Sequence, residues 1–236
     1  MSSPSVEPQQ IRELIANSRW FADLPDAALD KLAAQTRTKR YQDGEFVYFV
    51  GDELENLFCI VSGKVRMSLI SVEGQKFLLT DLEPGQWFGE GALAQQNLRV
   101  HEARAEEESI VLQIPRRVIL ATGDEYPILY KNLLFSHFYR TQAVYELLAG
   151  MVFYPLKSRL AGRLLNLADR HGREVGEGIK LEVKMSQLEF AQMTMGSRQR
   201  VNKVLRDWVQ RGILHKQKDY YIIADIERLR AEVEAQ

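Results

Sequence analysis

The spacing of hydrophobic residues predicts helices at the start of the chain and strands after them. Residues 9–35 place leucine and isoleucine at helical intervals, and Pro25 suits the first turn of a second helix. From about residue 36 to 114, short β-rich runs alternate with glycine-containing turns, a pattern typical of a sandwich or jelly roll. The predicted strands span residues 45–50, 57–61, 65–70, 75–79 and 109–114.

After Pro115 the pattern returns to helix. Residues 126–152 contain no glycine before Gly150, which predicts one long helix ended by Pro155. Positions 137, 141, 144, 148 and 151 of this helix step by four and three, as in the seam of a coiled coil. We interpret this seam as a homodimer interface. The alternative is a helix packed only on its own sheet domain.

The last third of the chain predicts a helix-turn-helix followed by a wing. A helix over residues 156–170 precedes a hairpin over residues 175–183. Ser186 and Glu189 then form a capping box, a short break follows at Met195 and Gly196, and Ser197 caps the next helix. Residues 212–214 and 220–223 predict the two strands of the wing.

The outer face of the second of these helices carries cations and amides. Arginine matches guanine, and glutamine or asparagine matches adenine, so Arg198, Gln199 and Asn202 are candidate base readers. The other cations suit phosphates or the scaffold, and the alternative is a solvated amphipathic helix pair. The predicted DNA-binding residues are Ser197, Arg198, Gln199, Arg200, Asn202, Lys203, Arg206 and Lys216.

Charge is unevenly distributed although the net charge is only −1. Residues 1–125 hold 13 basic and 20 acidic side chains, whereas residues 126–236 hold 18 and 12. An acidic half joined to a half with a basic cluster indicates two tasks, one of which involves a polyanion.

Several classes of protein are excluded or disfavoured. Cys59 is the only cysteine, which excludes an intrachain disulfide and a Cys-ligated cluster, and its apolar neighbours predict burial. No apolar run is long enough to span a bilayer, and residues 1–20 lack the order of a signal peptide, so we expect a cytoplasmic protein without membrane contact. We find no nucleophile–base motif, metal spacing or Walker loop, and we predict neither an enzyme nor a metal site.

Two motifs resemble those of the CRP/FNR family of bacterial transcription regulators. The first is Phe88-Gly89-Glu90-Gly91-Ala92-Leu93, five further residues, Arg99, and then Ala103 and Ala105, which is similar to the cyclic-nucleotide-binding signature. The second is the run 197–205, SRQRVNKVL, which is similar to the family's recognition helix. The resemblance covers about the whole chain, including the glycines of the predicted turns.

The resemblance implies a ligand site built on the first motif. In cyclic-nucleotide-binding members, the glutamate at the Glu90 position holds the ribose hydroxyl and the arginine at the Arg99 position pairs with the cyclic phosphate, as their chemistry allows. His137 and Thr141 are the polar candidates on the long helix. The predicted ligand-binding residues are Gly89, Glu90, Gly91, Ala92, Arg99, Val100, His137 and Thr141.

Departures from the family pattern leave the effector open. Val100 stands where a hydroxyl residue is usual, and His101 where alanine is usual. The effector is therefore cyclic AMP, another cyclic nucleotide or dinucleotide, or a different small ligand. No ligand at all is the remaining alternative, with Glu90 and Arg99 as a structural ion pair.

The DNA-binding half also departs from the family pattern. Gln199 replaces a common glutamate, so we expect a half-site changed at one base pair. Met195 replaces the usual turn glycine, so we expect the turn to shift slightly towards Gly196.

Together these patterns predict an α+β protein in three parts. Residues 1–125 form a β-roll (double-stranded jelly-roll) sensor domain, residues 126–153 the dimerisation helix, and residues 154–236 the winged helix-turn-helix DNA-binding domain. The expected function is a dimeric transcription regulator, gated allosterically by the ligand, that binds a palindromic operator in double-stranded DNA and contacts RNA polymerase. The alternatives are a cyclic-nucleotide-binding regulatory module without DNA binding and a ligand-independent DNA-binding regulator.

Overall fold

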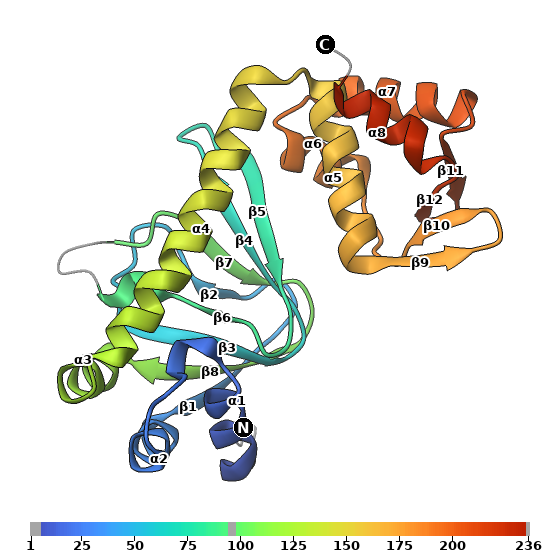
Figure 1. The fold of residues 1–236 in the computed structure, drawn as a ribbon. Coiled ribbons are helices and arrows are strands. Elements are labelled where there is room, and N and C mark those ends of the chain that lie inside the picture. The colour runs from blue at the N-terminus through green and yellow to red at the C-terminus, as the bar shows by residue number, and fades with distance from the viewer. Residues whose placement is uncertain (1–5, 94–97, 235–236) are drawn as a thin grey trace. The chain divides into compact units, whose positions relative to one another are not determined.

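The computed structural model describes residues 6–93 and 98–234, which form two compact units dividing between Gln142 and Ala143 (Figure 1). The first unit begins with α1 (Pro8–Ala16), a 3-10 helix η1 (Arg19–Phe21) and α2 (Asp26–Gln35). These confirm the two predicted helices, although Pro25 precedes α2 as its N-cap rather than lying in its first turn.

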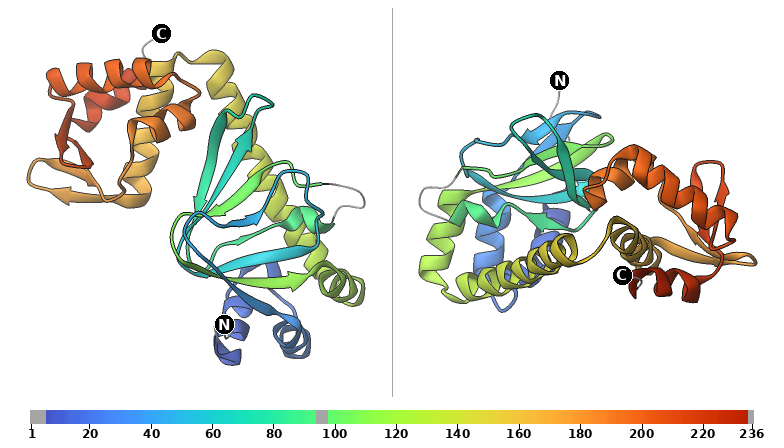
Figure 2. Two further views of the ribbon diagram at one scale, coloured as in Figure 1. Left: turned by 180° about the vertical axis from the view of Figure 1, so that it is seen from behind. Right: turned by 90° about the horizontal axis from the view of Figure 1, so that it is seen from above.

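Two four-stranded antiparallel sheets follow, with the strand orders β1-β8-β3-β6 and β2-β7-β4-β5. Both sheets are visible from behind in Figure 2. The strands are β1 (Arg37–Tyr41), β2 (Phe46–Tyr48), β3 (Asn56–Ser62), β4 (Val65–Ile70), β5 (Lys76–Leu82), β6 (Trp87–Phe88), β7 (Glu102–Ala105) and β8 (Ser109–Pro115). All five predicted strands are present, and β1, β6 and β7 were not predicted. The β-roll prediction is therefore confirmed.

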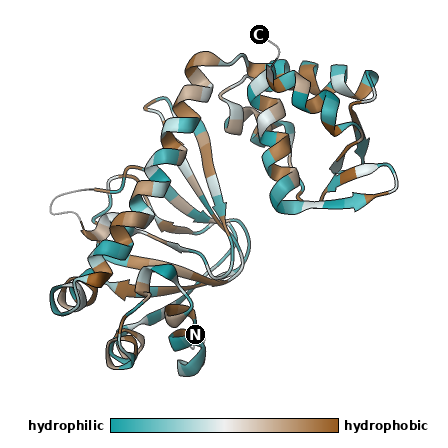
Figure 3. Cartoon of the chain, in the orientation of Figure 1, coloured by the Kyte–Doolittle hydropathy of each residue, from teal (hydrophilic) through white to brown (hydrophobic). Residues whose placement is uncertain are grey.

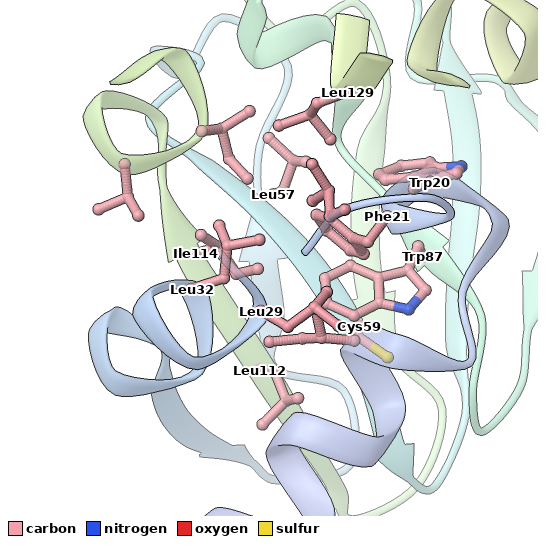
Figure 4. Close-up of a cluster of buried hydrophobic side chains, with 14 of the residues drawn as sticks. Trp20, Phe21, Leu29, Leu32, Leu57, Cys59, Trp87, Leu112, Ile114 and Leu129 are labelled. Carbon is pink, nitrogen blue, oxygen red and sulfur yellow. The ribbon is translucent and has the colours of Figure 1, made fainter. Parts of the chain in front are cut away.

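Strand β3 separates two cores because successive side chains of a strand point to opposite faces. Leu57 and Cys59 face the helices (Figure 4), whereas Phe58 and Ile60 lie in the core shared by the two sheets. Cys59 is fully buried, and burial raises the pKa of its thiol to about 12. The prediction that this cysteine is a structural hydrophobe is confirmed.

Helix α3 (Arg116–Glu125) leads into α4 (Ile128–Phe153), the long helix that the sequence predicts. Only Leu129 and Leu133 of α4 are buried, and Figure 3 shows that hydrophobic residues recur along the rest of its length. Among the described residues, no helix is both long enough and apolar enough to cross a membrane.

The second unit contains a four-stranded sheet of order β11-β12-β10-β9, which shares one hydrophobic core with the helices of this unit. Its elements after α4 are α5 (Leu156–His171), β9 (Gly172–Val175), β10 (Gly178–Leu181), α6 (Gln187–Thr194), α7 (Arg198–Gln210), β11 (Leu214–Gln217), β12 (Tyr220–Ile223) and α8 (Ile226–Glu234). The predicted hairpin and the predicted wing are both present, and β10 joins them into one sheet by pairing with β12. Helix α8 was not predicted.

Candidate functional site

The first motif forms a sharp bend at the edge of the roll. Strand β6 ends at Phe88, Gly89 turns with φ +91°, and the 3-10 helix η2 (Glu90–Leu93) follows. A Cβ on Gly89 would lie 2.9 Å from Phe58 and 3.0 Å from the Asn56 carbonyl oxygen. Glycine is therefore required here for both its backbone angle and its size.

The other two small residues of the motif differ in exposure. Gly91 is exposed, whereas Ala92 is fully buried. The Ala92 carbonyl accepts a hydrogen bond of 2.6 Å from Arg116 Nε, which fixes η2 to α3. Residues 94–97 of the motif's spacer lie outside the described residues.

Glu90 forms its ion pair with Arg140 of α4. Arg140 Nη1 lies 2.8 Å from both carboxylate oxygens, and Arg140 also donates to the Trp87 carbonyl and lies 5.4 Å from the Trp20 ring. A carboxylate has about four acceptor sites, so Glu90 retains capacity for a ligand hydroxyl. The alternative of a Glu90–Arg99 ion pair is wrong, because Arg140 takes that place.

Arg99 is a buried cation with little to neutralise it. It is 5% exposed, its Nη2 donates to the Asn56 carbonyl at 2.9 Å, and its guanidinium lies 4.3 Å from the centre of the Tyr48 ring. Its Nε has no hydrogen-bond partner among the described residues. Burial lowers the pKa of Arg99, while the charges of Tyr48, Glu90 and Asp52 oppose this effect. A buried cation with a donor to spare is the arrangement expected of an anion-binding site.

The two residues that depart from the family pattern lie in the bend before β7 and differ in exposure. Val100 is 71% exposed, whereas Arg99 beside it is buried. His101 is half-buried, and its Nδ1 lies 3.2 Å from the Tyr48 hydroxyl. Burial first, and then the charge of Arg99, lower the pKa of His101. The imidazole is therefore neutral at pH 7 and belongs to the polar cluster around Arg99.

Helix α4 presents different polar groups to the roll than the sequence indicated. His137 is exposed and Thr141 half-buried, and within the described residues neither side chain hydrogen-bonds to the roll. Ser136 instead accepts a 2.8 Å hydrogen bond from Trp20 Nε1. Sequence reasoning missed Arg140. Its signal is that Leu129, Leu133, Ser136 and Arg140 follow one another at steps of four, three and four, along one helix face.

The second motif forms the predicted helix-turn-helix. The capping box of Ser186 and Glu189 is present in both directions, and Ser197 Oγ accepts from the Arg200 backbone at 3.3 Å. Val201, Leu205 and Trp208 are the buried face of α7. Of the predicted DNA-binding residues, Asn202 is half-buried, and the others are exposed: Ser197, Arg198, Gln199, Arg200, Lys203, Arg206 and Lys216.

The turn between α6 and α7 uses Met195 itself in the left-handed conformation. Met195 has φ 49° and ψ 41°, and Gly196 does not have a positive φ. The expected shift of the turn towards Gly196 is therefore wrong. Gly196 is small for another reason, because a Cβ there would lie 2.6 Å from Leu156 Cδ1.

Substitutions of Met195 and Gly196 are expected to change the free energy of unfolding in opposite directions. Met195→Gly should raise the free energy of unfolding by about 0.5–1 kcal/mol, because the left-handed strain of a non-glycine residue exceeds the entropy cost of glycine. Gly196→Ala should lower it by about 1–2 kcal/mol through overpacking against Leu156. Urea unfolding of each variant measures both changes, and equal shifts of the same sign would contradict this account of the turn.

Comparisons with known proteins agree with this geometry. Residues 38–126 match the cyclic nucleotide-binding domain, and residues 158–232 match the Crp-like helix-turn-helix domain. A CRP-like cAMP-activated global transcriptional regulator of Mycobacterium tuberculosis is 28% identical over 217 residues, covering 92% of this chain and 97% of the relative. The cyclic AMP receptor protein of Thermus thermophilus is 26% identical over 84% of this chain and 88% of its own length.

Solved structures have the same fold. A CRP-family transcriptional regulator from Thermus thermophilus is 29% identical and aligns with a TM-score of 0.65. The alignment covers 84% of this chain and 97% of that structure. A mutant of CooA from Carboxydothermus hydrogenoformans aligns with a TM-score of 0.73 at 24% identity, over 94% of this chain and 98% of its own.

A cyclic nucleotide-binding β-roll and a Crp-like winged helix-turn-helix thus occur in one chain, an arrangement that defines a class of transcription regulators rather than enzymes. The chain belongs to the CRP/FNR family.

Proposed function

We propose that this protein is a homodimeric transcription regulator whose binding to operator DNA is gated by a small anionic ligand in the β-roll. The observation that carries the ligand site is Arg99, a cation that is 5% exposed and whose Nε has no hydrogen-bond partner in the described part of the chain. Burial of such a group is costly, and a bound anion would compensate it. The cAMP-activated relatives support a cyclic nucleotide or a related compound as the effector.

Different residues of the roll would bind different parts of the ligand. The Arg99 guanidinium would bind the phosphate as a fork, and Glu90 would accept from a sugar hydroxyl. Arg140 holds both oxygens of Glu90 at 2.8 Å and therefore orients that carboxylate. Because Arg140 belongs to α4, a ligand that rearranges this ion pair would act directly on the helix that we assign to dimerisation, residues 126–153.

Exposed apolar side chains on α4 support the homodimer. Five of the large ones lie at steps of four and three if Thr141 is counted with them: Leu134, Phe138, Tyr145, Leu148 and Val152. The other large exposed apolar residues of α4 flank this stripe or follow it: Phe135, Tyr139, Val144 and Phe153. Leu148 is 55% exposed and Val152 65% exposed. Such a stripe is a coiled-coil seam that a second copy would cover. It shares positions 141 and 148 with the seam predicted from the sequence.

The basic face of α7 supports DNA as the partner. A symmetric dimer would place two copies of α7 about 34 Å apart, which matches one turn of duplex and requires a palindromic operator. The exposed Arg198 and Gln199 lie in the first turn of α7, where base edges are met. The bound dimer would act on RNA polymerase in the cytoplasm. The match to a Crp-like helix-turn-helix disfavours a module without DNA binding.

Footprinting of genomic fragments with the full-length protein tests this proposal. We expect a protected palindrome whose occupancy rises when a cyclic mono- or dinucleotide is added, and a dimer mass by light scattering. Arg198→Ala should remove the footprint without changing that mass. If the palindrome is protected to the same extent with and without each compound, the protein is a ligand-independent regulator. If no fragment is protected at all, the proposal of DNA binding is wrong.

A further inference from the structure

The side chain of Asn202 on α7 is hydrogen-bonded to the preceding helix, α6. Gln187, the first residue of α6, donates from Nε2 to Asn202 Oδ1 at 3.0 Å. Gln187 is itself held in place, because the capping box of Ser186 and Glu189 fixes the first turn of α6. The oxygen of the Asn202 carboxamide therefore has a fixed partner within the protein.

This pair lies in a hollow between α7 and the wing strands β11 and β12. The hollow has a volume of about 370 Å³, with Leu205 and Tyr221 among its apolar lining and Arg206 and Lys216 among its polar lining. None of the described residues that line it is acidic. Within residues 6–93 and 98–234, neither Arg206 nor Lys216 has a carboxylate within 4.0 Å. The hollow therefore combines amide groups with two cations that no described carboxylate neutralises.

The orientation of Asn202 disfavours the base-reading role that the sequence suggested. An asparagine that recognises adenine accepts through its oxygen and donates through its amino group at the same time. Here one acceptor site of the oxygen is already used by Gln187, so the amino group, a donor, is the part of the carboxamide that remains fully available to a ligand. A donor beside two cations suits an anionic oxygen.

We infer that this hollow seats a phosphate of the DNA backbone and that Asn202, oriented by Gln187, donates to that phosphate instead of reading a base. The inference rests on the proposed DNA-binding function and assigns this site within it. Duplex DNA is the occupant because the hollow lies between the recognition helix and the wing, the two elements that follow a DNA strand. Base reading by α7 then falls to Arg198 and Gln199, and Asn202 fixes the position of the helix on the duplex.

Selection of duplexes from a randomised library, followed by binding titrations of the full-length protein, tests the inference. Asn202→Ala should weaken binding by about tenfold, the value of one hydrogen bond to a charged group. The loss should be equal on the preferred duplex and on duplexes with single base-pair changes, so the selected sequence stays the same. Gln199→Ala is the matched control, because it should flatten the preference at one base pair.

Asn202→Asp provides a second variant of nearly identical shape. It keeps the acceptor for Gln187 but presents an anionic oxygen to the phosphate, so binding should weaken by more than in Asn202→Ala, again uniformly across sequences. Arg206→Ala should reduce the salt dependence by about one unit of slope. Thermal unfolding of each variant checks that the fold is retained.

Three results would overturn the inference. If Asn202→Ala loses its preference at one base pair only, Asn202 reads a base. If Asn202→Asp binds DNA as tightly as the unsubstituted protein, the hollow does not seat a phosphate. Both presuppose that the unsubstituted protein binds DNA. Failure of the unsubstituted protein to bind any duplex, with every effector tried, would instead overturn the proposed function and the inference with it.

Discussion

Arg99→Ala is expected to weaken binding of the effector by at least about a hundredfold. The substitution removes two or more charge-assisted hydrogen bonds to the ligand phosphate, each contributing about 1.5–3 kcal/mol. Calorimetric titration with a panel of cyclic mono- and dinucleotides, at one pH and ionic strength, measures the change. Whichever compound binds the unsubstituted protein is then titrated into the variant.

The same substitution should leave the ligand-free protein intact, which separates a binding role from a structural one. Arg99 is 5% exposed and no described residue pairs with its Nε, so the free protein carries the cost of burying it. We expect an unchanged or higher melting temperature for Arg99→Ala without ligand, and no further rise when ligand is added.

Arg104→Ala is the matched control for this experiment. Arg104 lies on β7, is partly exposed, and already pairs with Glu106 at 2.6 Å. Its removal should leave effector affinity unchanged. If affinity instead survives in Arg99→Ala and falls in Arg104→Ala, the phosphate site lies elsewhere on the roll.

The strands of the roll differ in how visible they are in the sequence. β3 and β8 are runs of buried apolar residues between turn signals, and both were predicted. β1 is Arg-Thr-Lys-Arg-Tyr with only Tyr41 buried, so no hydrophobic pattern marks it, and β6 is two residues long. Their strand conformation depends on pairing with β8 and β3, which is a tertiary effect.

In the candidate sites, too, contacts between residues far apart in the chain could not be predicted from the sequence. Glu90 and Arg99 could be predicted as site residues because the family motif fixes their spacing, but their partners within the protein could not. Arg140 lies 50 residues from Glu90, and no local pattern reveals such a pair. Asn202 was correctly placed on α7, yet its bond to Gln187 spans 15 residues across a turn whose geometry depends on Met195. Helix α8 did carry a local signal, since Asp225 caps it and Ile226, Leu229 and Val233 share one face.

Glu232→Ala is expected to lower the free energy of unfolding of the second unit by about 3 kcal/mol. Glu232 of α8 is a buried carboxylate that joins two other helices. Its oxygens lie 2.5 Å from Lys157 Nζ on α5 and 2.6 Å from Arg211 Nη2 at the end of α7, and its side chain is 6% exposed. Removing it leaves Lys157 without its anion and Arg211 with Asp207 alone, 3.1 Å away. Urea unfolding followed by fluorescence measures the loss, and Glu227→Ala, an exposed glutamate on the same helix, should cause little change.

The pH dependence of this loss of stability follows from the direction in which the fold shifts the pKa of Glu232. Burial alone would raise the pKa of Glu232, but the hydrogen bonds from Lys157 and Arg211 outweigh it and lower the pKa below 4.5. A carboxyl group with a depressed pKa in the folded state contributes stability above its unfolded pKa, and that contribution disappears as the pH falls through the folded value. The stability gap between the unsubstituted protein and Glu232→Ala should therefore be constant near neutrality and narrow below about pH 4.5. A gap that widens in acid would mean that Glu232 is protonated in the folded protein and acts as a neutral donor rather than as the anion between α5 and α7.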